Sequence, residues 1–355
     1  MATLYLMEQG SVVKLDGDTL VVHIPANEEK GTERRKVRIP LVKVEQVVAY
    51  GKINFTAPAR TALLEQGVDV CYCTQRGRFL GWLMSPFSKN GLLRIEQHRA
   101  HNDPVRSFTL AQAFVLGKLQ NMRTMLMRAN RKRGDAEIAR AIRELKGVMG
   151  RVIEMRPEDA GHPQDPSRPQ AGTMQGSLMG LEGVGTSIYF SVFGRLLDGD
   201  WEFRGREKRP PRDPINALLS FGYTLLTNQA LSAVSIVGLD PYVGFLHSSQ
   251  YGKPALALDV IEPFRPLIVD SVVLTLLNNG MLKRSDFQEE FGAWRLTDKG
   301  RRIFLSKFEE RLNTEIRHPV FKYKATYRRC LELEVRLVAK WLMGEIPRYK
   351  PFVVR

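Results

Sequence analysis

The sequence predicts an α+β protein, with a small N-terminal β domain at residues 1–90 and a larger, mostly α-helical domain at residues 91–355. The first 90 residues contain short apolar runs separated by turn residues, which is the pattern of β-strands. After Pro86, apolar residues recur at the spacing of an amphipathic helix. A chain of 355 residues is also long enough for two domains that each bury a core of their own.

The β domain is predicted from its turns and its short strands. Asp16-Gly17 lies between two apolar runs within residues 4–24, and an Asp-Gly pair in this setting is a strong hairpin signal. A short helix is expected at residues 58–66, where Gly67 ends it. Further strands, in a mostly antiparallel arrangement, are expected at residues 37–49, 68–74 and 79–84.

The composition favours an anionic partner. Lys and Arg number 53 against 38 Asp and Glu, which gives a net charge of +15 at pH 7. This balance is typical of proteins that bind polyanions, and nucleic acid is the first candidate. No run reaches the roughly 18 apolar residues of a membrane-spanning helix, and the N-terminus lacks the pattern of a secretory signal, so we expect a cytoplasmic protein. The three cysteines form neither a disulfide framework nor a zinc ribbon.

The second domain is predicted from helical spacing and helix-capping residues. A stretch rich in Pro and Gly at residues 156–177 is expected to be an exposed, flexible loop. Asp213 and Pro214 form a typical helix start, and Pro263 with Pro266 suggests another, which would put Glu262 at or near an N-cap. Helices are expected at residues 108–127, from near Leu178, at 214–237, from Pro263 through Gly280, at 299–314 and at 331–343.

One stretch, residues 238–266, combines a histidine with a close acidic pair in a segment otherwise poor in charge. Turn residues divide it into short pieces, so His247, Asp259 and Glu262 are expected to lie near one another. One imidazole and carboxylate oxygens suit Mg²⁺ or Mn²⁺ better than zinc or an iron–sulfur cluster. Glu182 is a further candidate, because apolar residues surround it on its predicted helix. An exposed helix carboxylate is an equally good interpretation of that residue.

Basic, aromatic and polar side chains near these acids are candidates for contacts with phosphate. The basic loop at residues 204–213 could follow a phosphate backbone, although a merely solvated loop explains it as well. Arg265 could neutralise a phosphate or form an ion pair with Glu262. The candidate contacts are Tyr189, Arg204, Arg206, Lys208, Arg209, Asn216, Tyr223, Lys253 and Arg265.

Three sequence blocks together resemble the universal CRISPR-associated endonuclease and integrase of spacer acquisition. They are LEGVGTSIYF at 181–190, DPINALLSFGYTLL at 213–226 and GLDPYVGFLHSSQYGKPALALDVIEPFRP at 238–266. The resemblance implies that Glu182, His247 and Glu262 bind a divalent metal and catalyse cleavage and transesterification of DNA. It assigns Asp259 the role of an auxiliary acid.

The resemblance also implies a mechanism and partners. A 3′-hydroxyl, or water in the hydrolytic mode, would attack a DNA phosphodiester in line, while the metal stabilises the charge on the phosphate oxygens. The substrates would be double-stranded and branched DNA. The protein would be a homodimer formed through its β domain, and a small CRISPR-associated adaptation partner would bridge two dimers.

Two other functions remain compatible with the residues. In a non-catalytic nucleic-acid-binding scaffold, the acids would be core or surface groups and the basic helices would bind alone. A metal hydrolase of small phosphate esters would use the same ligands, but such a substrate needs only a local positive pocket, so the net charge of +15 argues against it.

Overall fold

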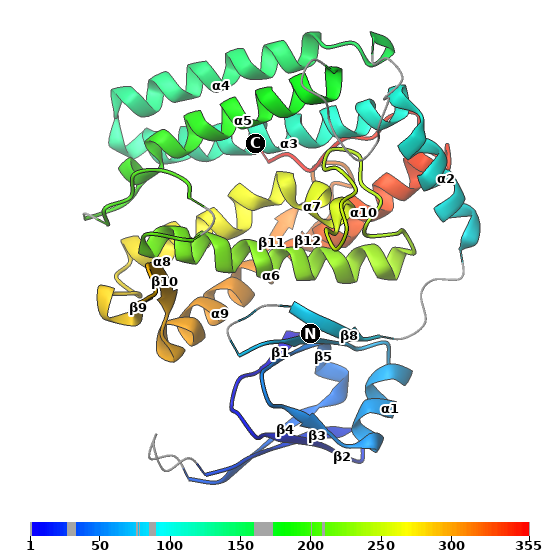
Figure 1. Cartoon of the computed structure of the whole chain (residues 1–355), viewed down its shortest axis with the longest axis vertical. Helices are drawn as coiled ribbons and strands as arrows, with labels where there is room; N and C mark the ends of the chain where they lie inside the picture. The colour runs from blue at the N-terminus through cyan, green and yellow to red at the C-terminus, as the bar shows by residue number, and fades with distance from the viewer. Residues whose placement is uncertain are drawn as a thin grey trace. The chain divides into compact units, whose positions relative to one another are not determined.

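The structure is a computed structural model that describes residues 2–26, 33–75, 77, 79–84, 90–159, 173–199, 201–207 and 210–354. The chain divides into two compact units, Met1–Phe87 and Ser88–Arg355. The first unit is built mainly from strands and the second mainly from helices (Figure 1). This confirms the predicted α+β class. None of the described helices is long and apolar enough to cross a membrane.

The N-terminal unit consists of two four-stranded sheets and one helix. Its elements are β1 (Ala2–Leu6), β2 (Val12–Asp16), β3 (Thr19–Ile24), β4 (Arg35–Pro40), β5 (Val44–Tyr50), β6 (Asn54–Phe55), α1 (Ala57–Glu65), β7 (Asp69–Cys73) and β8 (Phe79–Leu83). One sheet has the order β1-β5-β7-β8 and the other β4-β3-β2-β6. The predicted hairpin is confirmed: β2 pairs with β3 around a two-residue turn, in which Gly17 has a φ of 56°.

Two expectations about the strands are wrong. The domain is not mostly antiparallel, because β5 is parallel to both β1 and β7, and β6 is parallel to β2. A crossover through α1 joins β5 to β7, and such a crossover places strands parallel. The single strand expected at residues 37–49 is two strands, since β4 ends at Pro40 and a 3-10 turn at Leu41–Lys43 leads the chain into the other sheet.

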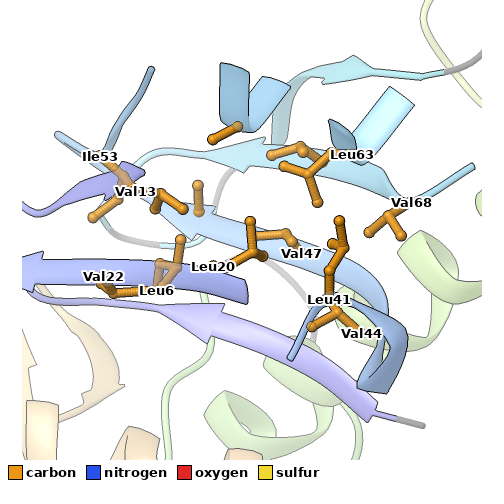
Figure 2. Close-up of a cluster of buried hydrophobic side chains, with 13 residues drawn as sticks. Leu6, Val13, Leu20, Val22, Leu41, Val44, Val47, Ile53, Leu63 and Val68 are labelled. Atoms are coloured by element: carbon orange, nitrogen blue, oxygen red, sulfur yellow. The ribbon is translucent and has the colours of Figure 1, made fainter. Parts of the chain in front are cut away.

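Apolar side chains from both sheets and from α1 form the core of this unit (Figure 2). Val13, Val47 and Leu63 are completely buried. Burial of an aliphatic side chain of this size stabilises a fold by roughly 1.5–3 kcal/mol, so this cluster explains how a unit of fewer than 90 residues holds together. The labelled members are Leu6, Val13, Leu20, Val22, Leu41, Val44, Val47, Ile53, Leu63 and Val68.

The second unit contains helices and two short hairpins. The helices are α2 (Gly91–Asn102), α3 (Pro104–Arg133), α4 (Ala136–Glu154), α5 (Met174–Phe193), α6 (Pro214–Val237), α7 (Ala255–Ile261), α8 (Ser271–Asn278), α9 (Asp298–Leu312) and α10 (Tyr327–Leu342). The hairpins are β9 (Phe287–Glu290) with β10 (Ala293–Leu296), and β11 (Glu315–Arg317) with β12 (Lys324–Thr326). Helices α3, α4 and α5 pack side by side, and α6 packs against α7 and α10 (Figure 1).

The helix starts follow capping chemistry. The predicted bounds of α6 are confirmed, with Asp213 accepting a hydrogen bond from the backbone N–H of Asn216 at 2.8 Å. Helix α5 begins at Met174 rather than near Leu178, because the Thr173 hydroxyl caps it. The last residues of the predicted loop at 156–177 therefore belong to a helix, and Pro157–Asp159 form a 3-10 turn. Residues 160–172 of that loop lie outside the described residues.

The expectation that Glu262 lies at the N-cap of a helix is wrong. The helical run begins earlier, at α7, passes through a 3-10 turn at Glu262–Phe264 and a π-helical turn at Pro266–Asp270, and continues as α8. Proline lacks the N–H that continues an α-helix. In this run the two prolines therefore mark departures from α-helical hydrogen bonding rather than a helix start.

The segment after α10 is tied into the interior of the helical unit. Asn121 of α3 is fully buried and donates hydrogen bonds to the carbonyl oxygens of Pro263 and Phe352, both at 2.8 Å. Its side-chain oxygen accepts from the backbone N–H of Val354 at 3.0 Å. The Phe352 ring stacks on Phe264 with centroids 4.8 Å apart. One amide side chain thus joins α3, the turn after Glu262 and the C-terminal segment.

Glu334 of α10 holds the same segment from another side. It is fully buried, and its Oε1 accepts hydrogen bonds from the Tyr349 hydroxyl and, at 2.9 Å, from the backbone N–H of Phe352. Burial raises the pKa of Glu334 to about 7, although both hydrogen bonds oppose the shift. The carboxyl group is therefore a titratable group inside the core.

Candidate metal centre

Helix α5, which carries Glu182, lies unusually close to α3. Gly185 follows Glu182 by one turn, and a Cβ atom at Gly185 would overlap Cδ2 of Leu119 on α3. Because glycine has no side chain, α5 can pack directly against Leu119 of α3. Glu182 consequently reaches Lys118, the neighbour of Leu119 on α3.

A second glycine brings the turn at Glu262 against α3 in the same way. A Cβ atom at Gly117 would lie 2.8 Å from Cβ of Pro351 and 3.0 Å from Cγ of Pro263. The proline rings can occupy this space only because position 117 carries no side chain. Glu262, which directly precedes Pro263, is thereby placed beside Lys118.

Lys118 joins the two glutamates. Its Nζ donates a hydrogen bond to Oε1 of Glu182 and lies 2.7 Å from Oε2 of Glu262. The side chains of Lys118 and Glu262 are almost completely buried, with 5% and 3% exposed, whereas Glu182 keeps 24%. The Thr186 hydroxyl also donates to Glu182 Oε1, at 2.9 Å. The group therefore opens to solvent on the Glu182 side.

Asp259 holds the histidine in place. It is fully buried, and its Oδ2 accepts hydrogen bonds from the backbone N–H groups of Phe245 at 2.6 Å and Leu246 at 3.0 Å. Its Oδ1 accepts from the backbone N–H of His247 at 3.0 Å and lies 2.7 Å from Nδ1 of the same residue. A carboxylate beside Nδ1 favours the tautomer with the proton on Nδ1. The other ring nitrogen, Nε2, then has a free lone pair.

The loop that carries His247 is fastened to α2 as well. The buried Gln97 side chain donates to the carbonyl oxygens of Asp240 at 2.8 Å and Val243 at 2.7 Å. Gly244 packs so closely that a Cβ atom there would lie 2.8 Å from Oδ2 of Asp259. These contacts fix the backbone of the loop on both sides, and with it the direction of the imidazole ring.

The imidazole faces Glu262. His247 Nε2 lies 3.8 Å from Glu262 Oε1, and Arg265 Nη2 lies 3.1 Å from the same oxygen. Burial of Glu262 raises its pKa, but Arg265 and Lys118 outweigh this effect and hold the pKa at about 2. Glu262 is therefore ionised at neutral pH. Of the two interpretations left open for Arg265, the ion pair with Glu262 is present in the structure.

The structure thus links Glu182 and Glu262 through Lys118 and places His247 beside Glu262. Among the described residues, no three His, Cys, Asp or Glu side chains are grouped tightly enough to hold a metal ion as they stand. Glu262 is nevertheless buried, and Lys118 Nζ is the cation that lies 2.7 Å from its Oε2. Asp259 is different, because all four of its hydrogen bonds go to the histidine loop. Its place is behind the histidine and not beside the other acids.

Two tyrosines named from the sequence converge on a second buried acid, Asp270. The Tyr189 hydroxyl donates to Oδ2 at 3.0 Å and the Tyr223 hydroxyl to Oδ1 at 2.6 Å. Burial raises the pKa of Asp270 to about 6 against the opposing effect of these hydrogen bonds. Tyr189 is fully buried, so in this structure it has no surface that could contact DNA. Arg265 lies over the Tyr223 ring, 4.9 Å from its centroid.

Arg206 covers three polar or aromatic side chains of α6, Asn216, Ser220 and Tyr223. Its guanidinium donates to Asn216 Oδ1 at 2.7 Å and to the Ser220 hydroxyl at 3.1 Å, and lies 5.5 Å from the Tyr223 ring centroid. Asn216 is fully buried. Arg206 and Asn216, both candidates for contact with DNA, therefore bond to each other.

The remaining basic candidates differ in exposure. Arg204 is exposed and Lys253 is half-buried. Arg265 has 14% of its side chain exposed. Lys208 and Arg209 lie outside the described residues. Arg204 is thus the described basic residue of this set that is most accessible to a phosphate backbone.

Lys118 was not among the site residues expected from the sequence, although its position in the helical pattern could have indicated it. Ala111, Val115, Lys118 and Met122 are spaced so that they share one face of a helix. Apart from Lys118, these residues are buried and apolar. A lysine in such a row needs an anionic partner. Asp270, which interrupts the apolar run at residues 267–277, is a signal of the same kind.

The fold and the site define an α+β protein whose helical unit carries converging acids, one histidine and basic side chains. The chain belongs to the family described as CRISPR associated protein Cas1, since the sequence model of that family matches residues 4–310. This confirms the resemblance seen in the three sequence blocks.

Relatives and solved structures agree with this assignment. A Geobacter sulfurreducens protein described as a CRISPR-associated exonuclease Cas4/endonuclease Cas1 fusion is 38% identical, over 99% of this chain and 60% of its own length. This chain thus spans about three fifths of that relative. A Thermus thermophilus protein described as CRISPR-associated endonuclease Cas1 3 is 36% identical, over 100% of this chain and 98% of its own length.

Two solved structures share the fold. A casposase bound to integration product superposes with a TM-score of 0.83 at 24% identity, over 99% of this chain and 93% of that chain. A chain of a Cas6-RT-Cas1–Cas2 complex superposes with a TM-score of 0.73 at 25% identity, over 99% of this chain and 36% of that chain.

Proposed function

We propose that this protein is a metal-dependent DNA endonuclease and integrase, which inserts short DNA fragments as new spacers into a CRISPR array. The observation that carries the proposal is the convergence of three side chains: Glu182 and Glu262 share the Lys118 ammonium group, and His247 Nε2 faces Glu262. Membership of the Cas1 family and the endonuclease relatives support the reaction class. The proposed reaction is attack of a 3′-hydroxyl group on a DNA phosphodiester.

The residues present fit a divalent metal ion. Glu182, Glu262 and Nε2 of His247 would hold it, since one imidazole with carboxylate oxygens suits Mg²⁺ or Mn²⁺. One observation supports the fit: the Lys118 ammonium group already contacts both glutamates, as a bound cation would. When bound, such an ion neutralises charge on a transferring phosphoryl group.

The chain's own residues prepare the site for this chemistry. Asp259 orients His247 and keeps the Nε2 lone pair available. Arg265 adds a fixed positive charge beside Glu262, and such preorganised charges stabilise the charge that develops on phosphate oxygens. In-line attack by a 3′-hydroxyl group or water needs no covalent protein nucleophile. In this proposal Asp259 is a positioning residue, while Tyr189 and Asn216 support the interior.

The proposed partners are DNA, a second copy of the chain and a small adaptation protein. The net charge of +15 favours DNA through release of counterions, and Arg204, Lys208, Arg209 and Lys253 are the proposed contacts. A small partner of the Cas2 kind is supported by the solved Cas6-RT-Cas1–Cas2 complex, whose name includes Cas2. The proposed homodimer forms through the β unit, and the small partner bridges two such dimers. A self-complementary surface on a small unit suits such a dimer.

The test is a Mn²⁺ and Mg²⁺ titration of cleavage and integration on linear and branched DNA, with and without the small partner. Glu182→Ala, His247→Ala and Glu262→Ala should each abolish both reactions, and they should leave most of the DNA affinity, because the basic surface remains. Matched controls are Glu144→Ala and His98→Ala, which change exposed residues and should keep activity.

Two outcomes would contradict the proposal. Wild-type activity in a folded ligand variant at saturating Mn²⁺ would remove that residue from the metal site. DNA binding without cleavage by the wild-type protein, at any concentration of either metal and with the partner present, would favour the non-catalytic scaffold instead.

A further inference from the structure

Lys118 occupies a place where a lysine is costly. It lies in the middle of α3, its side chain is 95% shielded from solvent, and its helix neighbours pack in the core. A buried ammonium group loses several kcal/mol of hydration unless anionic groups surround it. Lys118 has two such groups, Glu182 and Glu262.

The balance of these effects keeps Lys118 charged. Its Nζ contacts one carboxylate oxygen of each glutamate, and two anionic partners at this range favour the charged form of a buried amine. The four charged side chains in direct contact are then Lys118 and Arg265, both positive, and Glu182 and Glu262, both negative. The net charge of these four side chains is zero without any bound ion, so the two cations offset the repulsion between the two carboxylates.

A divalent ion would change this balance. It would use the oxygens of Glu182 and Glu262, and Lys118 Nζ already lies within 2.7 Å of Glu262 Oε2. An ammonium group and a divalent ion that share the same oxygens at this range repel each other strongly, because the site is shielded from water. Both cannot keep their full set of contacts.

We propose that Lys118 is an internal counter-ion, which occupies the carboxylates in the metal-free protein and competes with the divalent ion for them. This inference rests on the proposed function, since it assumes that Glu182 and Glu262 are metal ligands. Two features of the structure fit the role. The four-carbon lysine stem can swing its head group without moving the backbone, and α3 packs closely against its neighbours at Gly117 and against α5 at Gly185.

The counter-ion explains two properties of the site together. The metal-free protein holds one buried and one half-buried glutamate close together without unfolding, because Lys118 supplies the compensating charge. Metal binding then has to overcome the existing ion pairs, so the affinity for Mn²⁺ is lower than the same ligands would give alone. The site therefore fills only where divalent ions are plentiful.

The experiment measures Mn²⁺ affinity of the full chain by electron paramagnetic resonance, for the wild type and for Lys118→Met. Methionine keeps the length and the apolar stem but removes the charge. The variant should bind Mn²⁺ more tightly, by about ten-fold or more, because the competing charge is gone. Its metal-free form should unfold at a lower temperature than the wild type, since two carboxylates lose their cation, and Mn²⁺ should restore much of the loss.

Lys340→Met is the matched control. Lys340 forms a surface ion pair with Glu345 at 2.7 Å and is 52% exposed, so its removal should change neither the Mn²⁺ affinity nor the thermal stability measurably. A second measurement needs no variant and decides the matter if Lys118→Met does not fold. Acetic anhydride should modify Lys118 of the wild type faster when Mn²⁺ is bound, as mass spectrometry of peptides would show, while modification of Lys340 stays unchanged.

The outcomes separate this inference from the proposed function. If the wild type binds Mn²⁺ and Lys118→Met binds it equally or more weakly, Lys118 supports the metal and the counter-ion role is overturned. An acetylation rate at Lys118 that stays equal or falls with Mn²⁺ overturns it as well. If neither protein binds Mn²⁺, the proposed metal-dependent function itself fails, and the inference fails with it.

Discussion

Replacement of Asp259 by asparagine tests whether this acid positions the histidine loop. The change keeps the shape of the side chain but replaces one acceptor oxygen with an NH₂ group. In the structure the carboxylate accepts from three backbone N–H groups, at Phe245, Leu246 and His247, and faces the ring nitrogen Nδ1. Each carboxylate oxygen takes part in two of these four contacts. Whichever oxygen the NH₂ group replaces, two hydrogen-bond donors therefore lose their acceptor.

The magnitude follows from the lost contacts. A buried donor left without an acceptor costs about 1–3 kcal/mol, so two of them cost about 2–6 kcal/mol, a large part of the roughly 5–15 kcal/mol that holds a typical domain together. If the amide NH₂ faces His247, the ring must also present a lone pair at Nδ1, which moves its proton to Nε2. The nitrogen that faces Glu262 then ceases to be a metal ligand.

The assay combines urea unfolding with amide hydrogen exchange and Mn²⁺ binding. Asp259→Asn should lower the unfolding midpoint, speed up exchange at residues 245–247 and weaken Mn²⁺ binding. Asp103→Asn is the matched control, since Asp103 caps α3 through one oxygen only and asparagine caps a helix about as well. Unchanged exchange at residues 245–247 in a folded Asp259→Asn protein would refute the positioning role.

Two further substitutions test the packing and the buried acid of α10. Gly117→Ala should destabilise the helical unit by about 1–3 kcal/mol, because the new methyl group would meet Pro351. The control Gly147→Ala has open space at its Cβ position and should stabilise α4 by up to about 1 kcal/mol. Similar shifts of the thermal unfolding temperature for both variants would count against close packing at Gly117. Glu334→Gln tests the pH dependence. Burial raises the pKa of Glu334 to about 7, so the folded protein holds the proton on Glu334 more tightly than the unfolded chain does. The resulting contribution to the free energy of unfolding is complete below the unfolded pKa near 4.3 and is lost as the pH rises from about 4 to 7. The unfolding free energy of the wild type should fall more over that range than that of the variant, and parallel curves would contradict the assignment.

The sequence predicted those parts of the fold that depend on local chemistry. The Asp16-Gly17 hairpin and the bounds of α6 follow from turn and cap residues, which act within a few positions. The direction of β7 relative to β5 depends on where α1 brings the chain back to the sheet. Short apolar runs in the sequence do not indicate that position. The sequence does not predict the helical run around Glu262, because a proline can either start a helix or interrupt one. The packing of this run against α3 decides which of the two occurs.

The candidate site was predictable to a similar extent. A histidine and acids in a segment poor in charge indicated His247, Asp259 and Glu262, but spacing alone does not separate an acid that faces the site from one that lies behind it. The burial of Asp259 under three backbone N–H groups is a property of the folded loop. Lys118 is far from the acids in sequence and meets them only because Gly117 and Gly185 let helices approach.

The amide of Asn121 forms hydrogen bonds with residues that lie far away in the sequence. It is satisfied by Pro263, 142 positions later, and by Phe352 and Val354, 231 and 233 positions later. During synthesis α3 therefore leaves the ribosome long before the partners of its polar interior exist, and contacts so distant in sequence form slowly. Water must solvate Asn121 until then, on the same helix face that presents Lys118. The hydrogen bonds that join α3 to the turn after Glu262 and to the C-terminal segment are therefore complete only after Phe352 and Val354 have been synthesised.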